Sequence, residues 1–399
     1  MTTTPTSSPF HEPPDFSLVL GGPLYQLYRK TYLSGPILEL VLRRVLLFSL
    51  ITWMPLFLLC LYAGQLFSSN YLGFLRDLET HVRFLIALPV LIGAEIIVHT
   101  RTRTVVKRFA ESRIITPAET PKFHAAIESA LRARNSVLIE LGILILVYTL
   151  GHWIWLNKIA FLGTTWYGVS NATGFHLSLA GYWNAFVSVP IFQFILLRWY
   201  FRILIWFWLL WKISRLKLRL MPAHPDHAGG IGFLGRSSYA FSPLLFAQGA
   251  LLSGLIASRV LFEGQTLPSF KITVAAFVGF FVLAILGPLA MFSPQLARAK
   301  RTGLARYGNL ANKYVSEFDE KWLDGDKKNN YEPLLGTADI QSLADLGNSY
   351  AGVREMRIVP FGLRDITRLV AATAVPLLPL LLMIMPLEEL LMKIIKIVF

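Results

Sequence analysis

Long apolar segments alternate with short polar segments along the whole chain. Segments of this length are typical of helices that cross a bilayer, because about 20 residues are needed to span roughly 30 Å of hydrocarbon. We therefore expect an all-α fold, a polytopic transmembrane helical bundle with additional amphipathic helices. The seven predicted spans are Val45–Leu66, Phe84–Val98, Val137–Trp155, Tyr182–Trp211, Ala240–Phe262, Ile272–Phe292 and Leu369–Pro386.

The second predicted span is the shortest, and it contains Glu95. A short span with a carboxylate needs either flanking side chains that reach the headgroups, such as Arg83 and His99, or protection by neighbouring helices. The prolines predict departures from regular helix geometry in the later spans, because each removes a helix hydrogen bond. They are Pro190, Pro288, Pro376 and Pro379.

Basic residues fall on alternate sides of the predicted spans. Eight Lys and Arg residues lie between Arg101 and Arg134, five between Lys212 and Arg236, and twelve between Arg298 and Arg368. The intervening loops carry few. Because cytoplasmic loops are enriched in Lys and Arg, this pattern predicts a cytoplasmic amino terminus and a periplasmic or extracellular carboxyl terminus.

The chain divides into four predicted regions. A cytoplasmic tail with an interfacial helix, Tyr25–Arg44, occupies 1–44, and spans one to six with the basic loops 99–136 and 212–239 occupy 45–297. Residues 298–368 form a cytoplasmic helical segment, and 369–399 hold the seventh span and a terminal helix.

The cytoplasmic segment has an amphipathic stripe at helical spacing, made of Leu304, Tyr307, Ala311, Tyr314, Phe318 and Trp322. Thr337 is the predicted N-cap of its second helix, and the turn 324–330 is predicted to be solvated.

Composition agrees with a membrane protein, since 54% of the residues are hydrophobic and 16% are charged. The net charge of +14 is expected to hold the cytoplasmic loops against anionic lipid headgroups rather than against nucleic acid. The expected partners are membrane lipids and other copies of the chain in a homo-oligomer, with a cytoplasmic protein as a further candidate. We expect no cofactor.

The loop between the fourth and fifth spans is dense in groups that bind ions or bend backbone. Two histidines and one aspartate, His224, Asp226 and His227, are candidate metal ligands, since imidazole and carboxylate suit zinc or iron. Backbone N–H groups of the loop could instead hold an anion or a lipid phosphate. The third interpretation is structural, with glycines allowing close backbone contact. The glycines are Gly229, Gly230, Gly232 and Gly235.

One feature of this loop matches the dinucleotide fingerprint G-x-G-x-x-G, from Gly230 to Gly235. That motif binds a dinucleotide only between a strand and a helix of a βαβ unit. Here a membrane span precedes it, so the dinucleotide interpretation is rejected. No phosphate-binding G-x-x-x-x-G-K-[ST] loop is present.

Polar and charged groups inside the predicted spans are the second set of candidates. Arg198 and Arg202 lie four residues apart on one helical face. Either they reach the cytoplasmic headgroups at the end of a long helix, or they pair with Glu140 or Glu95 beside a permeation path. The full set of pore or gating candidates is Glu95, Glu140, Gln193, Arg198, Arg202 and Gln248.

Three sequence stretches carry a resemblance to other proteins. They are His224–Leu234, Pro333–Tyr350 and Pro386–Leu391. These stretches resemble segments that recur in uncharacterised multispanning proteins of bacterial inner membranes. The resemblance implies a bacterial inner-membrane location, and it brings no activity or catalytic residue with it.

Three functions remain open from the sequence. The first is an oligomeric ion channel or small-solute transporter with the intramembrane arginines near the path. The second is a membrane scaffold or signalling component that docks a partner through its cytoplasmic helices. The third is a membrane-bound enzyme or a binder of phosphate or lipid headgroups that uses residues 224–235. The absence of a clear nucleophile–base pair favours a protein that is not an enzyme.

Overall fold

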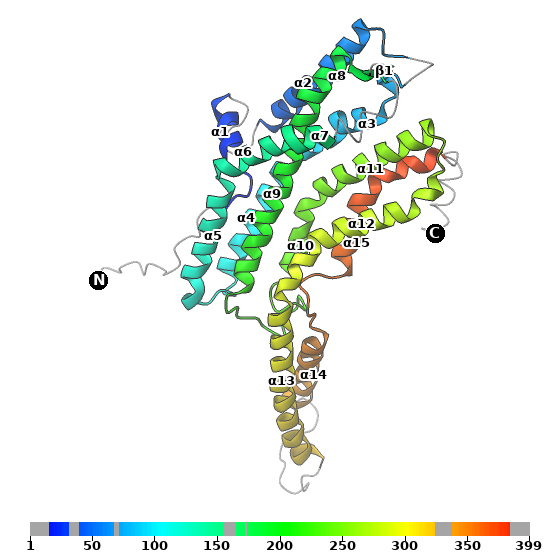
Figure 1. The fold of residues 1–399 in the computed structure, drawn as a ribbon. Helices are drawn as coiled ribbons and strands as arrows, with labels where there is room; N and C mark the ends of the chain where they lie inside the picture. Colours follow the sequence, from blue (N-terminus) through cyan, green and yellow to red (C-terminus); the bar gives the residue numbers. More distant parts are fainter. Residues whose placement is uncertain are drawn as a thin grey trace.

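A computed structural model describes residues 16–31, 40–67, 72–154, 165–171, 174–323 and 337–383. The described chain is almost entirely helical (Figure 1). Within it, seven helical stretches are long and apolar enough to cross a membrane: Val41–Tyr62, Leu78–Glu111, Val137–Ile154, Leu179–Ser214, Phe233–Phe262, Leu267–Trp322 and Leu363–Met383. The predicted all-α polytopic fold is therefore confirmed.

Span one is a single α-helix, and spans two to four contain both α-helical and π-helical segments. Span one is α2 (Val41–Tyr62). The segments of spans two, three and four are α3 (Leu78–His81), η2 (Val82–Ala87), α4 (Leu88–Glu111), α6 (Val137–Leu146), η4 (Val147–Gly151), α7 (His152–Ile154), α8 (Leu179–Trp183), η6 (Asn184–Ser188) and α9 (Val189–Ser214).

The last three spans include short 3₁₀ segments. Their parts are α10 (Phe233–Ser237), η7 (Ser238–Phe241), α11 (Ser242–Phe262), η8 (Leu267–Phe270), α12 (Lys271–Leu286), η9 (Gly287–Phe292), α13 (Ser293–Trp322), α15 (Leu363–Ala374) and η10 (Val375–Met383). The remaining elements are α1 (Pro23–Lys30), η1 (Phe74–Arg76), η3 (Pro117–Glu119), α5 (Thr120–Arg134), α14 (Ala338–Glu355) and the hairpin of β1 (Gly168–Asn171) and β2 (Gly174–Leu177).

Two predicted boundaries are wrong. The second span runs from Leu78 to Glu111 rather than from Phe84 to Val98, so it is long enough to cross the bilayer without thinning it. The sixth span continues through η9 into α13, so the predicted boundary at residue 297 lies inside a continuous helix. Polar residues in the second half of each helix end the apolar pattern, but they do not end the helix, because the backbone hydrogen bonds continue.

The proline of the fourth span, Pro190, lies at the start of α9, directly after the π-helical segment η6. Pro190 has no N–H to donate to the carbonyl of Phe186, one turn earlier. The hydroxyl of Tyr148, on the third span, donates to that carbonyl oxygen at 3.1 Å. A backbone acceptor inside the membrane is thereby satisfied by a neighbouring helix, which also ties the two spans together.

The first span repeats this arrangement. Pro55 lies inside α2, so the carbonyl of Ile51 lacks its usual helix donor. The indole N–H of Trp183 donates to the Ile51 oxygen at 3.1 Å, which links span four to span one. The other prolines predicted to interrupt helices lie in the 3₁₀ segments η9 and η10: Pro288, Pro376 and Pro379.

The spans form two groups that meet along α11. The first group contains α2, α4, α6 and α9, with α5 packed against α9 (Figure 1). The second contains α11, α12, α15 and η10. Gly254 of α11 lies against Val82 of η2, where an added Cβ would be 3.3 Å from the valine side chain. Small residues of α11 thus allow the two groups to approach closely.

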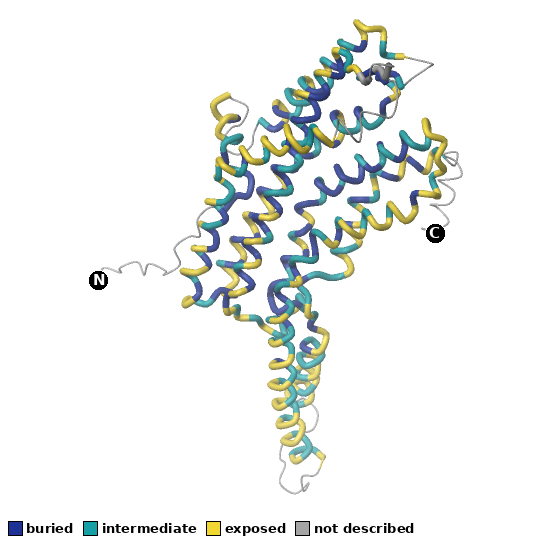
Figure 2. Tube along the Cα trace, in the orientation of Figure 1, coloured by how far each residue is buried: buried dark blue, intermediate teal, exposed yellow. Residues whose placement is uncertain are grey.

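A helical hairpin, α13 and α14, extends from the bundle (Figure 1) and is mostly exposed (Figure 2). The amphipathic stripe predicted on α13 is confirmed, since all six of its residues are half-buried on the helix that packs on α14. The Tyr314 hydroxyl donates to the Asp339 carbonyl at 3.1 Å, and the Trp322 indole donates to the Asp339 carboxylate at 3.0 Å. Thr337 occupies the predicted N-cap position of α14 but makes no side-chain capping bond. The predicted turn 324–330 lies outside the described residues.

The predicted interfacial helix Tyr25–Arg44 is wrong as a single element. Helix α1 ends at Lys30, and a separate helix, α2, begins at Val41. Arg43 is exposed, whereas Arg44 is buried inside the first span. The sequence pattern missed this because a buried arginine with a carboxylate partner looks the same in sequence as an arginine in contact with headgroups.

Candidate functional site: a buried arginine–glutamate cluster

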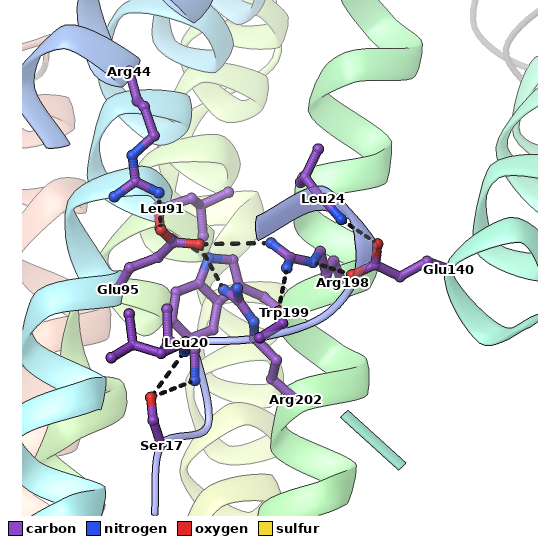
Figure 3. Close-up of polar contacts among 12 residues, drawn as sticks. Ser17, Leu20, Leu24, Arg44, Leu91, Glu95, Glu140, Arg198, Trp199 and Arg202 are labelled. Atoms are coloured by element: carbon purple, nitrogen blue, oxygen red, sulfur yellow. Dashed lines mark hydrogen bonds and ion pairs between the residues drawn. The ribbon is translucent and has the colours of Figure 1, made fainter. Parts of the chain in front are cut away.

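Five charged side chains from four spans meet in the first helix group. We call them the buried ionic cluster: Arg44 of α2, Glu95 of α4, Glu140 of α6, and Arg198 and Arg202 of α9 (Figure 3). Their exposed fractions are between 1% and 7%. Charges this deeply buried are expensive to desolvate unless each has well-placed partners. The stability of the cluster therefore depends on the partners of each charge.

Glu95 is the centre of the cluster. One of its oxygens, Oε2, accepts from Nη1 of Arg44. The other, Oε1, accepts from Nη1 of Arg202 at 2.9 Å and lies 3.7 Å from Nη1 of Arg198. A single carboxylate thus compensates three guanidinium groups from two other helices, which makes it the residue on which the local packing of α2, α4 and α9 depends.

Glu140 forms the second half of the cluster. Its Oε1 accepts from Nε of Arg198 at 2.9 Å. Its Oε2 accepts from the backbone N–H of Leu24 at 2.9 Å, near the start of α1. Nη2 of Arg198 also donates to the carbonyl of Gly21 at 3.4 Å. The cluster therefore holds the backbone of the amino-terminal segment as well as side chains (Figure 3).

The amino-terminal segment Phe16–Leu24 covers one side of the cluster. Its side chains are buried at Phe16 and Leu18, and the Ser17 hydroxyl lies 2.8 Å from Nδ1 of His99 on α4. Gly22 has a φ of +88°, and a Cβ there would lie 2.8 Å from Oε1 of Glu140. Glycine is needed at this position for both reasons, because L side chains rarely adopt that φ and the carboxylate leaves no space.

Helix lengths place the cluster near one end of the spans, the end that the distribution of Lys and Arg predicts to be cytoplasmic. Arg44 and Glu140 each lie in the first turn of a span that begins on the predicted cytoplasmic side. Arg198 lies 19 residues after Leu179, which is about 28 Å along the helix at 1.5 Å per residue. The remainder of α9, to Ser214, packs on α5. The sequence left open whether the two arginines reach headgroups or pair with glutamates, and the structure shows the pairs.

Aromatic rings enclose the cluster from two sides. The Arg202 guanidinium lies over the ring of Trp199, 4.9 Å from its centroid, and the Arg44 guanidinium lies 5.1 Å from the centroid of Tyr28. The Trp199 indole is itself fixed by donation to the Leu91 carbonyl at 2.8 Å. Cation–π contacts of this kind contribute about 0.5–2 kcal/mol each, more when water is excluded. A cavity of about 10 Å³ remains between these rings and the arginines.

Two of the pore or gating candidates lie outside the cluster. Gln193 is half-buried and faces the third span, where its Oε1 lies 2.5 Å from where a Cβ on Gly151 would be. Gln248 is buried on α11 and interacts with the Tyr200 hydroxyl. The structure thus brings together Glu95, Glu140, Arg198 and Arg202, but not the two glutamines.

The loop between spans four and five is organised by Asp226. Its Oδ1 accepts from the backbone N–H groups of Ala228 at 2.8 Å and Gly230 at 3.1 Å, and its Oδ2 accepts from Gly232 at 2.8 Å. Gly229 and Gly230 have φ values of +65° and +95°, which turn these N–H groups toward one centre. These N–H groups, which one of the three interpretations assigns to an external anion, instead donate to the chain's own carboxylate.

The same loop joins distant parts of the chain. Arg357 donates from its backbone N–H to the His227 carbonyl at 2.7 Å and from its side chain to the Asp226 carbonyl at 2.9 Å. Gly235 donates to the Pro360 carbonyl at 3.1 Å, and a Cβ on Gly235 would lie 2.7 Å from that oxygen. These contacts support the structural interpretation of the glycines: close backbone approach between the loop and the segment before α15.

The pKa of Asp226 follows from these contacts. Burial alone raises the pKa of this carboxyl, but the three backbone N–H donors and the nearby His224 ring lower it. The net result is a pKa below the usual value for aspartate. Asp226 is therefore ionised at neutral pH and stabilises the loop in that form.

The described residues supply no further ligand for a metal site at this loop. Among them, no three His, Cys, Asp or Glu side chains lie together in a way that could hold an ion. His227 Nδ1 lies 3.9 Å from a Glu355 oxygen, too far for a hydrogen bond. A cavity of about 330 Å³ opens beside the loop, with Arg108, Ser112 and Arg236 on its wall. Both of these arginines are exposed.

Comparison with protein-family models, with curated proteins and with solved structures gave no match to this chain. The class is nevertheless defined by the fold: the protein is an α-helical, multi-pass integral membrane protein. What it does has to be argued from the site.

Sequence reasoning missed two parts of the site. Arg44 was assigned to an interfacial helix, although its place three residues after Val41, at the start of a long apolar run, is compatible with an intramembrane partner for Glu95. Ser17–Leu24 was assigned to a tail, and only the Gly21–Gly22 pair indicated a special backbone. Neither signal identifies a contact by itself, because both contacts join residues far apart in the sequence.

Proposed function

We propose that this protein is an ion channel or a small-solute transporter, and that the structure represents its closed state. The buried ionic cluster is the gate, and the amino-terminal segment Phe16–Leu24 is the element that closes it. The single observation that carries the proposal is that three arginines and two glutamates are buried together within the spans and are covered by a backbone segment that they themselves hold.

The support is energetic. Buried ion pairs contribute little net stability relative to well-packed apolar side chains, and ionisable groups inside a membrane are by default candidates for a transport path. Here Glu95 pairs with arginines of α2 and α9. Glu140 and Arg198 hold the backbone at Leu24 and Gly21. These elements can separate from one another. Displacement of the amino-terminal segment removes the Leu24 and Gly21 contacts and exposes Glu140 and Arg198 to the cytoplasm.

The closed state follows from the space that remains. The cavity in the cluster, about 10 Å³, takes at most one particle of the size of water. Tight packing of Trp199 and Tyr28 against the arginines prevents continuous hydration. Opening therefore requires movement, and Gly22 is a point at which the segment approaches the Glu140 carboxylate closely.

The proposed setting is a bacterial inner membrane, with the amino terminus in the cytoplasm and the carboxyl terminus in the periplasm. The support is the distribution of Lys and Arg among the loops. Anionic lipid headgroups are the proposed contacts of the basic cytoplasmic loops, and a homo-oligomer is the proposed assembly.

The test is ion efflux from liposomes loaded with potassium chloride and diluted into iso-osmotic sucrose, with purified wild type and Gly22→Ala at matched insertion. Alanine at φ +88° is strained and meets the Glu140 carboxylate, so it should displace the segment. If the closed state loses about 1.4 kcal/mol, the open population and the efflux rate rise about tenfold.

Gly142→Ala is the matched control. Gly142 lies two residues after Glu140 on α6, and an added Cβ there has no atom within 4 Å. Its efflux should equal that of wild type. Equal efflux in wild type, Gly22→Ala and a variant lacking Phe16–Leu24, all at the level of empty vesicles, would contradict the proposal.

The second candidate is a membrane scaffold that docks a cytoplasmic protein through α13 and α14. The observation in its favour is that this hairpin extends from the bundle and exposes large apolar side chains, including Leu310, Val315 and Ile340. The partner expected is a helix with a complementary apolar face. Co-purification of a stoichiometric protein with wild type, lost in Leu310→Glu/Val315→Glu, would favour the scaffold over the channel.

The third candidate is a binder of phosphate or lipid headgroups at the loop 224–235. Its support is now the cavity beside Arg108 and Arg236, since the loop's own N–H groups are occupied by Asp226. An Arg108→Gln/Arg236→Gln variant that binds vesicles containing anionic lipid as well as wild type does would exclude it.

A further inference from the structure

The charges of the buried ionic cluster do not balance. Among the described residues it contains three guanidinium groups, of Arg44, Arg198 and Arg202, but only two carboxylates. Arg134, which donates to the Ser17 carbonyl at the edge of the cluster, adds to the excess. A net positive charge in a dry site is strongly unfavourable, because its hydration is lost and nothing replaces it.

Two donors of the cluster also remain unused. Arg44 is only 1% exposed, yet its Nε and Nη2 have no hydrogen-bond partner among the described residues. Only its Nη1 is engaged, with Glu95. Buried guanidinium N–H groups without an acceptor are rare, and each lost hydrogen bond to a charged group is a large penalty.

The small cavity is lined in part by Arg44. Its wall includes Arg44, Arg198, Arg202, Tyr28 and Trp199, and its volume is about 10 Å³. This is about the space that one water molecule needs. The only carboxylate on its wall is Glu95, whose two oxygens already accept from arginines.

We propose that the cavity binds one small monovalent anion of the halide class, held by the unpaired Nε and Nη2 of Arg44 and by the excess positive charge of the cluster. Polyatomic anions such as phosphate are too large for the space. Fluoride, which is close to water in size, enters without rearrangement, and chloride enters with a small displacement of Tyr28 or Arg44.

The anion site extends the proposed function. Only the role of the bound ion rests on that proposed function. If the cluster is a gate, the bound anion is the permeating species or a counter-ion that keeps the gate closed. Binding itself does not depend on permeation. The two proposals can therefore fail separately.

The test measures chloride bound to purified protein in detergent by equilibrium dialysis with radioactive chloride, in sodium gluconate at constant ionic strength. We expect about one chloride per chain. Arg44→Gln removes both the unpaired donors and the excess charge and should abolish binding. Arg43→Gln, an exposed neighbour that also loses one charge, is the matched control and should bind like wild type.

A second variant covers the case in which Arg44→Gln does not fold. Arg44→Lys keeps the charge and a contact with Glu95 but has no Nε and no second terminal nitrogen, so its chloride affinity should fall about tenfold or more. Glu111→Gln, which changes an exposed carboxylate on α4, should leave binding unchanged.

A thermal measurement gives an independent readout. Halide at 100 times its dissociation constant should raise the unfolding midpoint of wild type and of Arg43→Gln by roughly 5 °C, and leave that of Arg44→Lys nearly unchanged. Wild-type protein that binds no chloride or fluoride, or the same midpoint shift in all variants, would overturn the proposal. If efflux changes in Gly22→Ala but the protein binds no halide, the gate proposal stands and the anion-site proposal is wrong.

Discussion

The two helix groups of this membrane protein are held together by different means. In the first group, α2, α4, α6 and α9 are joined by ion pairs around Glu95 and Glu140. Indole and hydroxyl groups of neighbouring spans also donate to the backbone carbonyls that proline leaves without a helix donor. In the second group, α11 and α15 approach so closely that a Cβ on Gly249 would lie 2.0 Å from the carbonyl oxygen of Thr373. One group depends on paired charges and the other on small residues.

This difference indicates where conformational change can occur. A small-residue contact has no alternative partner once it separates, since lipid tails offer only dispersion. Ion pairs can exchange partners, with each other, with water or with an ion, over small displacements. The first group, which also carries the amino-terminal segment, is therefore the part of the protein suited to a gate, and the second is suited to a rigid frame.

The largest expected effect is from Glu95→Ala. Removal of this carboxylate leaves three buried arginines with one acidic partner, Glu140, and should lower the free energy of unfolding by about 3–5 kcal/mol. Chemical unfolding in detergent micelles, followed by tryptophan fluorescence, measures this. Glu111→Ala, an exposed residue on the same helix, should change it by less than about 0.5 kcal/mol. Equal loss in both variants would mean that the cluster does not hold the first group.

A smaller effect is expected from Gly249→Ala in the second group. The added methyl group must push α11 away from Thr373, which should destabilise the protein by about 1–3 kcal/mol without altering ion efflux. Gly279→Ala on α12 is the control, because a Cβ there has no atom within 4 Å. The comparison between the two groups would fail if Gly249→Ala changed efflux as strongly as Gly22→Ala.

Next comes Asp226→Asn, which tests the loop beside the α13–α14 hairpin. The amide keeps one acceptor oxygen but loses the charge, so a loss of about 1–2 kcal/mol is expected at pH 7. Because the folded-state pKa of Asp226 is lowered, its contribution is present above the unfolded-state pKa and is lost as the pH falls through the folded-state value.

Unfolding at pH 7 and at acid pH checks this prediction. The difference between wild type and Asp226→Asn should shrink as the pH falls below about 4, the usual aspartate value, and vanish below the lowered one. A difference that stays constant over this range would show that the carboxylate charge is not what the loop uses.

The smallest effect is expected from Gln248→Leu. This glutamine is buried on α11, and its Nε2 has no hydrogen-bond partner among the described residues. Leucine of similar size should change the free energy of unfolding by less than about 1 kcal/mol in either direction, and efflux should stay at the wild-type rate. A clear change in efflux would extend the path from the first group into the second.

Much of the site was predictable from local sequence. The pair Arg198 and Arg202 shares one helix face through its spacing of four, and a buried pair of arginines in a membrane requires carboxylates, of which Glu95 and Glu140 were the candidates. The sequence left open whether these arginines reach headgroups or pair with the glutamates, and the structure shows the pairs. Gln193 and Gln248 satisfied the same criterion of polarity within a span, but polarity does not specify which neighbour a helix face meets.

The sequence by itself determined the seven spans, the amphipathic stripe of α13 and the residues at which proline interrupts a helix, because these depend on local hydrophobicity and local hydrogen bonds. Tertiary structure alone decided that Arg44 joins Glu95, that Asp226 fills its own loop, and that Phe16–Leu24 covers the cluster. Each of these is a contact between residues chosen by packing of whole helices, or by a backbone turn with φ above zero, and neither is encoded in a short stretch of chain.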